Sequence, residues 1–120
     1  KISHLLEAGS DFFVMPSRYE PCGLNQMYSM RYGTMPIVRS TGGLADTVRN
    51  YNADDPSAST GFVLWDLNPV SLRNTIRWAG DVYRKHPEAV AQLRRNGMTA
   101  DFSWDNTASQ YEKMYRDAHQ

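Results

Sequence analysis

The sequence has 120 residues, of which 41% are hydrophobic and 12% aromatic, a composition that can bury one modest core and argues against a disordered chain. Thirteen basic and thirteen acidic residues give a formal net charge of zero, so the charge signature of a protein that binds nucleic acid or an anionic membrane is absent. The single cysteine, Cys22, cannot form an internal disulfide, which favours a cytoplasmic location.

Three short apolar runs predict three buried strands of a parallel sheet, at residues 12–15, 35–38 and 62–65. Between the first two, residues 23–32 predict a helix that stops at Gly33. Leu24, Met27 and Tyr28 recur at helical spacing and are expected to form its buried face. A strand, a helix and a second strand in this order are typical of a compact βαβ unit.

Helical segments also follow the second and third strands. A short helix is expected over residues 44–50, then a polar surface loop over residues 52–61. Asn68 is expected to cap a longer helix that has Pro69 in its first turn. The predicted buried stripe of that helix consists of Leu72, Ile76, Ala79 and Tyr83.

Two further helices complete the chain. Pro87 is expected to start one that ends near Gly97, and Ser103 is expected to cap the last one. The last helix carries a packing stripe of Ala108, Tyr111, Met114 and Tyr115. The tail of the chain is therefore expected to be helical.

Alternating strands and helices predict an α/β fold, a partial Rossmann-like parallel sheet with flanking helices. Three strands are too few for the complete fold, so the missing strands are expected upstream of Lys1, and the chain is interpreted as a fragment of a soluble protein. We expect one domain over residues 1–120, with the Rossmann-like part over about residues 1–103 and a terminal helix over about residues 104–120.

In such sheets, ligands bind beyond the carboxyl ends of the strands. This rule brings three segments to one rim, at residues 17–20, residues 39–43 and Asp66. The most informative is Glu20 to Asn25, between a strand and a helix start. The peptide N–H groups of Cys22, Gly23, Leu24 and Asn25 are expected to be unpaired donors that bind an anion, with the helix dipole adding positive charge.

Glu20 offers an acceptor for hydroxyl groups beside those donors, a combination that suits a sugar phosphate. Gly23 leaves room for a ligand to approach the backbone. The alternative from the residues alone is that Glu20 and Asn25 merely cap the helix.

Other residues have simpler interpretations. Thr41, Gly42 and Gly43 could line the cleft, or could form only a tight turn before a helix. Arg18 and Arg39 are expected to be solvated or structural residues rather than to contact the substrate. Cys22 has no identifiable histidine partner for nucleophilic catalysis. The three histidines share no metal-ligand spacing, so no metal is expected; they are His4, His86 and His119.

The stretch PSRYEPCGLNQMYSMRYGTMPIVRSTGGLADTV, residues 16–48, closely resembles the C-terminal domain signature of bacterial glycogen synthases and plant starch synthases. A weaker resemblance continues over Gly61-Phe62 and Phe102-Ser103-Trp104. These enzymes are retaining glucosyltransferases in which two Rossmann-like domains face a cleft, the GT-B fold, and in which a last helix returns toward the N-terminal domain. The resemblance implies that this chain is part of the C-terminal, nucleotide-sugar-binding domain.

The resemblance also implies residue roles. Glu20 matches the first acid of the family's Glu, seven residues, Glu motif, which contacts the hydroxyls of the donor sugar; Tyr28 replaces the second acid and is assigned no role. Cys22, Gly23 and Leu24 match the backbone segment that reads the glucose and approaches the diphosphate. Asn25 stands where synthases commonly have Thr. The family's phosphate-binding Arg and Lys lie upstream of this segment.

The function implied by the resemblance is transfer of glucose from ADP-glucose to the non-reducing end of an α-1,4-glucan, with retention and without a metal or cofactor. The other half of the cleft would be the N-terminal domain of the same parent chain, so the fragment alone is expected to be inactive. One alternative is a retaining transferase that uses UDP-glucose or another sugar nucleotide. The other is a non-catalytic module that binds a nucleotide or a glucan.

Overall fold

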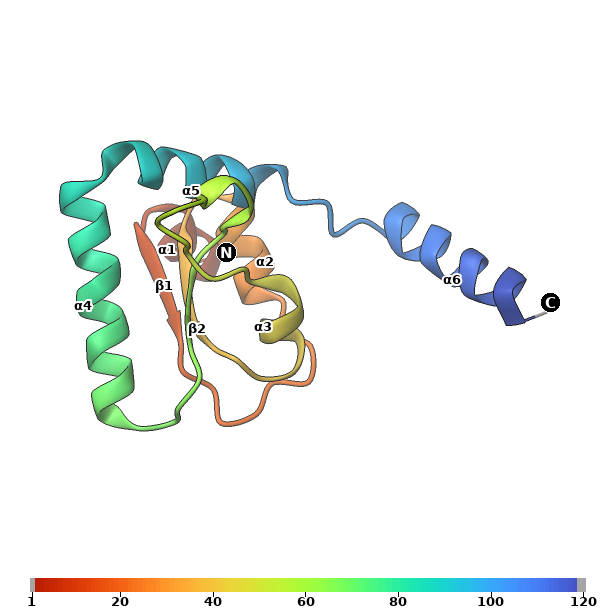
Figure 1. Ribbon diagram of the computed structural model, residues 1–120, viewed down its shortest axis with the longest axis horizontal. Coiled ribbons are helices and arrows are strands. Elements are labelled where there is room, and N and C mark those ends of the chain that lie inside the picture. The colour runs from red at the N-terminus through yellow and green to blue at the C-terminus, as the bar shows by residue number, and fades with distance from the viewer. Residues whose placement is uncertain (1, 119–120) are drawn as a thin grey trace.

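The structure, a computed structural model, describes residues 2–118, so the parts of our predictions that concern residues 1, 119 and 120, including His119, lie outside the described residues. Three parallel strands form one sheet in the order β1-β2-β3, with helices packed against it (Figure 1). The elements are α1 Ile2–Ala8, β1 Phe12–Met15, α2 Asn25–Arg31, β2 Met35–Arg39, α3 Gly42–Thr47, η1 Pro56–Ala58, β3 Phe62–Leu64, α4 Pro69–Lys85, α5 Pro87–Thr99 and α6 Trp104–Ala118. The expected α/β class and the parallel, partial Rossmann-like sheet are confirmed.

The three strands lie where the apolar runs predict them. β3 ends at Leu64, one residue earlier than expected, which leaves Trp65 beyond the sheet. β2 is the central strand, and its first four residues are buried. The prediction that β1 is buried on both faces is wrong, because β1 pairs only with β2 within residues 2–118 and Val14 is 41% exposed.

Two apolar clusters cover the two faces of the sheet. Met35 and Ile37 of β2 pack with Phe62 and Leu64 of β3 against α4 and α5. On the other face, Val38 and Val63 pack against residues of α2 and α3, among them Met30 and Leu44. The alternation of side chains along β2 and β3 thus builds three layers, with helices on both sides of the sheet (Figure 1).

The predicted buried face of α2 is right at Met27, which is partly buried against the apolar cluster, and wrong at Leu24 and Tyr28. Leu24 and Tyr28 are 52% and 41% exposed, whereas the buried residues of the helix are Gln26, Ser29 and Met30. Tyr28 instead lies edge-on to His4 of α1, with the ring centroids 5.4 Å apart. The helix has turned its polar Gln26 inward because that side chain has backbone partners inside the fold, described below.

α4 begins as expected. The Asn68 side chain accepts a hydrogen bond from the Ser71 N–H at 2.8 Å, and Pro69 is the first helical residue. Its predicted stripe is right at Ala79 and at Leu72, which is partly buried against the core, and wrong at Ile76 and Tyr83, which are exposed. The buried line runs through Thr75, Ala79 and Val82.

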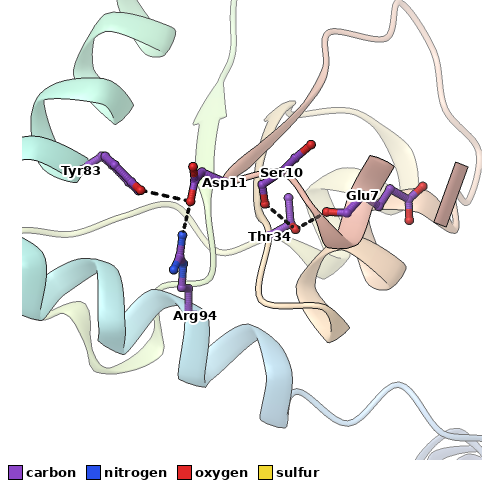
Figure 2. Close-up of polar contacts among 6 residues, drawn as sticks. All are labelled: Glu7, Ser10, Asp11, Thr34, Tyr83 and Arg94. Carbon is purple, nitrogen blue, oxygen red and sulfur yellow. Dashed lines mark hydrogen bonds and ion pairs between the residues drawn. The ribbon is translucent and has the colours of Figure 1, made fainter. Parts of the chain in front are cut away.

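Polar contacts hold the amino end of β1 (Figure 2). The Asp11 carboxylate accepts hydrogen bonds from the Tyr83 hydroxyl of α4, at 3.1 Å, and from Arg94 of α5. Beside it, the Thr34 hydroxyl contacts the carbonyl oxygens of Glu7 and Ser10. These contacts fasten the helices to the end of the sheet opposite the candidate site.

α5 ends at Thr99, and α6 stands apart from the sheet (Figure 1). The Asp101 carboxylate accepts a hydrogen bond from the Ser103 N–H before α6 begins, and the hydrogen bonds from Ser103 lower the pKa of Asp101. None of the described residues of α6 is buried, so its predicted packing stripe has no partner in this part of the chain. Among residues 2–118, no helix combines the length and the apolar character needed to cross a membrane.

Candidate functional site

Two loops meet at the carboxyl end of the sheet. One connects β1 to α2 and contains Glu20 and Cys22; we call it the Glu20 loop. The other connects β2 to α3 and leads into Gly42 and Gly43. The Gly43 N–H donates to the Glu20 carbonyl oxygen at 3.2 Å. The structure therefore brings two of the three segments predicted at the rim together, at the lower end of the sheet in Figure 1, where the strand arrows point; the third, Asp66, follows β3.

The two glycines are required by the closeness of this contact. A Cβ atom at Gly42 would lie 1.9 Å from the Glu20 carbonyl oxygen, and one at Gly43 would lie 2.0 Å from the Cys22 carbonyl oxygen. Gly42 also has a φ of +45°, which favours glycine. The Thr41 carbonyl accepts from Leu44 and starts α3, so the tight-turn interpretation of Thr41, Gly42 and Gly43 describes their backbone.

The helix after the first loop begins later than we expected. α2 starts at Asn25 with Leu24 as the N-cap residue, and Gly23 precedes it with a φ of +69°. Cys22 and Gly23 therefore belong to the turn before the helix, because a residue with positive φ cannot continue a right-handed helix. The N–H groups of Cys22, Gly23, Leu24 and Asn25 find no acceptor within residues 2–118.

The capping alternative for Glu20 and Asn25 is wrong, because no side chain caps the start of α2. Glu20 is half-buried, and its carboxylate accepts no hydrogen bond from the described part of the chain. A carboxylate in this state keeps its lone pairs available for hydroxyl groups of a ligand. Cys22 lies exposed beside it, and the described residues contain no cluster that could hold a metal ion.

Gln26 organises the site, although the sequence analysis assigned it no role. Its side chain is fully buried, and Nε2 donates to the carbonyl oxygens of Cys22, at 3.2 Å, and Gly23, at 3.1 Å. Nε2 also lies 3.1 Å from the Thr47 hydroxyl, which in turn donates to the Gly43 carbonyl at 2.6 Å. Gln26 therefore links the first loop to α3. Gln26 lies three and four residues before Ser29 and Met30, the other buried residues of α2, but this shared face is known only from the structure.

Arg39 supports the same loop from the end of β2. Its guanidinium donates to the Arg18 carbonyl at 2.6 Å, and its Nε is buried without a partner among the described residues. The expected structural role is confirmed for Arg39.

We expect Gln26→Leu to loosen the two loops without unfolding the protein. The Cys22 and Gly23 carbonyls would lose their buried donor, at a cost of about 1–3 kcal/mol. Amide hydrogen exchange over residues 20–47 should speed up by about 5- to 150-fold where it occurs by local opening. The control is Gln110→Leu on exposed α6, which should leave exchange in that segment unchanged. Equal exchange in both variants would contradict the role of Gln26.

Comparison with known proteins supplies a context for this geometry. Residues 1–97 match the family of glycosyl transferases group 1. The glycogen synthase of Treponema denticola is 54% identical over 118 residues, which are 98% of this chain and 24% of that protein. The chloroplastic/amyloplastic starch synthase 1 of Arabidopsis thaliana is 47% identical over 118 residues, which are 96% of this chain and 18% of that protein.

Two solved structures are similar to this fold. The catalytic domain of starch synthase IV from Arabidopsis thaliana, bound to ADP and acarbose, superposes with a TM-score of 0.84 at 39% identity, covering 97% of this chain and 24% of that one. Sucrose-phosphate synthase from Thermosynechococcus elongatus gives a TM-score of 0.65 at 29% identity, covering 96% of this chain and 27% of that one. The chain thus spans a quarter or less of the length of the two curated relatives.

Proposed function

This chain belongs to the glycosyl transferases group 1 family, and we propose that it is the donor-binding part of a retaining glucosyltransferase that moves glucose from ADP-glucose to the end of an α-1,4-glucan. The observation that carries the proposal is that the Glu20 carboxylate and the nearby N–H groups of Cys22 to Asn25 have no hydrogen-bond partner within residues 2–118, on a loop that Gly43 contacts. Such a site offers acceptors to sugar hydroxyls and donors to a phosphate.

In the proposed complex, the Glu20 carboxylate accepts hydrogen bonds from the hydroxyls of the donor glucose and positions the ring. The N–H groups of Cys22, Gly23, Leu24 and Asn25 face the diphosphate. When the bond between the glucose C1 and the diphosphate oxygen breaks, negative charge grows on the leaving group, and fixed N–H dipoles stabilise it. We assign Thr41, Gly42 and Gly43 to the wall of the same site, because Gly42 and Gly43 lie against the backbone of Glu20 and Cys22 and Thr41 directly precedes them.

The choice of ADP-glucose and an α-glucan is supported by the relatives. Proteins named glycogen synthase and starch synthase are about half identical to this chain over nearly its whole length, and the starch synthase IV structure is described as bound to ADP and acarbose. A donor such as UDP-glucose is the outcome that a substrate titration would reveal instead. The proposal assigns no metal and no cofactor to the reaction.

The remaining parts of the proposal concern the parent protein. The matched relatives are at least four times as long as this chain, which supports an N-terminal domain that forms the other side of the cleft. We assign about residues 1–103 to the Rossmann-like part and about residues 104–120 to a terminal helix, since α6 stands apart from the sheet. A single cysteine and no disulfide support a cytoplasmic location.

The test is Glu20→Ala in the full-length protein. Loss of hydrogen bonds to a charged group costs about 1.5–3 kcal/mol, so kcat with ADP-glucose and glycogen should fall by about 10- to 150-fold. The melting temperature should change little, because the Glu20 carboxylate has no partner in the described fold. Glu112→Ala, on exposed α6, is the matched control. Unchanged turnover in Glu20→Ala would refute the assignment, and absent turnover in the wild type with every donor would point to a binding module.

A further inference from the structure

A second surface feature lies at the same end of the sheet, between the end of β3 and α4. It is a depression of about 530 Å³; of the residues predicted at the ligand-binding rim, Asp66 lines it, whereas Glu20, Cys22 and Thr41 to Gly43 do not. We call it the tryptophan groove and define it by Trp65, Asp66, Asn74 and Trp78, which line it together with Val70 and Ser71. Since β2 separates β3 from β1, the groove is a place distinct from the Glu20 loop.

The groove presents two indole rings to solvent. Trp65 follows β3 and is 61% exposed, and Trp78 of α4 is 36% exposed. The Trp78 ring is held by Phe62, with centroids 5.1 Å apart and planes at 87°, and by Tyr51, with centroids 5.8 Å apart. Trp78 is thus packed against the core, and Trp65 is the more exposed of the two rings. Aromatic side chains together with a few polar groups around a depression are the usual lining of a small-molecule site.

The polar groups of the groove are of two kinds. Asn68 and Thr75 are already engaged, since Asn68 caps α4 and the Thr75 hydroxyl donates to the Ser71 carbonyl at 2.9 Å. By contrast, the side chains of Asp66 and Asn74 form no hydrogen bond with any described residue. A free carboxylate accepts hydrogen bonds and a free amide both donates and accepts, so together they match hydroxyl groups.

Charge narrows the class of ligand. Among the described residues that line the groove, only Asp66 is charged, so a phosphate or a nucleotide would meet repulsion there. A neutral molecule with an apolar face and many hydroxyls satisfies both the indole rings and the free polar groups. A run of sugar rings has this character, because each ring exposes C–H groups on its faces and hydroxyls at its edge.

We propose that the tryptophan groove binds consecutive glucose units of an α-glucan, as a second carbohydrate site separate from the donor site. The choice of an α-glucan among neutral sugars rests on the proposed function. Trp65 stacks on a sugar face, Trp78 forms the fixed wall, and Asp66 and Asn74 bind the hydroxyls. A glucan held here lies at the carboxyl rim of the sheet, which also carries the Glu20 loop, so the groove keeps the polymer near the transferase between transfers.

The test measures binding of maltoheptaose to the full-length protein by calorimetry, with Trp65→Ala, Trp65→Phe and Leu67→Ala compared. Removing a stacked ring should weaken binding to the groove by about tenfold, and phenylalanine should restore most of it. Leu67 is exposed next to the groove without lining it, so Leu67→Ala should bind as the wild type does. Trp65→Ala should also raise the KM for glycogen while the affinity for ADP stays unchanged.

Two results would refute glucan binding at the groove. One is that Trp65→Ala binds maltoheptaose as tightly as the wild type, and the other is that Trp65→Ala loses as much affinity for ADP as for maltoheptaose. These results are separable from failure of the proposed function. If the protein transfers no glucose but binds maltoheptaose through Trp65, the groove is supported and the transferase assignment is refuted. If turnover depends on Glu20 but glucan binding does not depend on Trp65, the transferase assignment is supported and the groove is refuted.

Discussion

Produced alone, the 120-residue chain is expected to extend no glucan and to bind ADP-glucose about two to four orders of magnitude more weakly than the full-length protein. The family resemblance implies that the phosphate-binding Arg and Lys lie upstream of residues 16–48, and this chain spans only 24% of the Treponema glycogen synthase. Each lost charge-assisted contact to phosphate costs about 1.5–3 kcal/mol, and two such losses give this range. Millimolar binding follows if the full-length protein binds in the micromolar range.

Catalysis should suffer further than binding. The proposed donor site is made of two loops that touch at the rim of the sheet, and a second domain would supply the opposite wall of the cleft. Without that wall, the acceptor is not aligned with the donor and water is not excluded. Turnover should therefore be undetectable even at saturating ADP-glucose.

The measurement pairs calorimetry of ADP-glucose binding with a radiolabelled glycogen-extension assay, on the 120-residue chain and on the full-length protein side by side. A circular dichroism spectrum and a cooperative melt of the short chain establish that it is folded in both assays. Micromolar binding by the short chain would show that the contacts outside it matter little. Glucan extension by the pure short chain would overturn the argument that it is half of a site.

The sequence predicts the elements better than it predicts their faces. Apolar runs locate all three strands, and Asn68-Pro69 locates the start of α4, because these signals depend on neighbouring residues. Burial depends on what the fold places next to each side chain. Val14 is exposed since β1 has one sheet neighbour in the described chain, and Ile76 is exposed since Ala79 and Val82 take the inner face of α4.

In the candidate site, too, local sequence signals identified some residues, and others could be recognised only in the fold. Glu20 to Asn25 could be singled out because a strand, a proline, a glycine and a helix start follow one another there. Gln26 could not, because a glutamine is usually a surface residue, and its burial becomes favourable only when the carbonyls of Cys22 and Gly23 accept from it. The contact between Gly43 and the Glu20 loop joins residues that are distant in sequence, so it could be recognised only in the folded structure.

Because of that contact, we expect the substitution Gly43→Ala to have the second large effect on activity. A Cβ atom at Gly43 would lie 2.0 Å from the Cys22 carbonyl oxygen and 2.7 Å from its Cα, and both neighbours are backbone, so the Glu20 loop must move. Overpacking of this kind costs about 1–3 kcal/mol of stability. A displacement of about 1 Å in a positioned group costs about 100-fold in rate, and here Glu20 and the N–H groups after it move together, so kcat/KM should fall by at least about 100-fold.

Gly80→Ala is the matched control, because the same change in α4 brings the new Cβ no closer than 3.5 Å, to the flexible Arg84 side chain. That variant should keep full activity and gain about 0.5–1 kcal/mol, since alanine is the better helix former. Kinetics and thermal melts of both variants in the full-length protein measure the difference. If Gly43→Ala retained half of the wild-type kcat/KM, the Glu20 loop would not depend on the close approach of α3, and the donor site would have to be positioned by Gln26 and Arg39 instead.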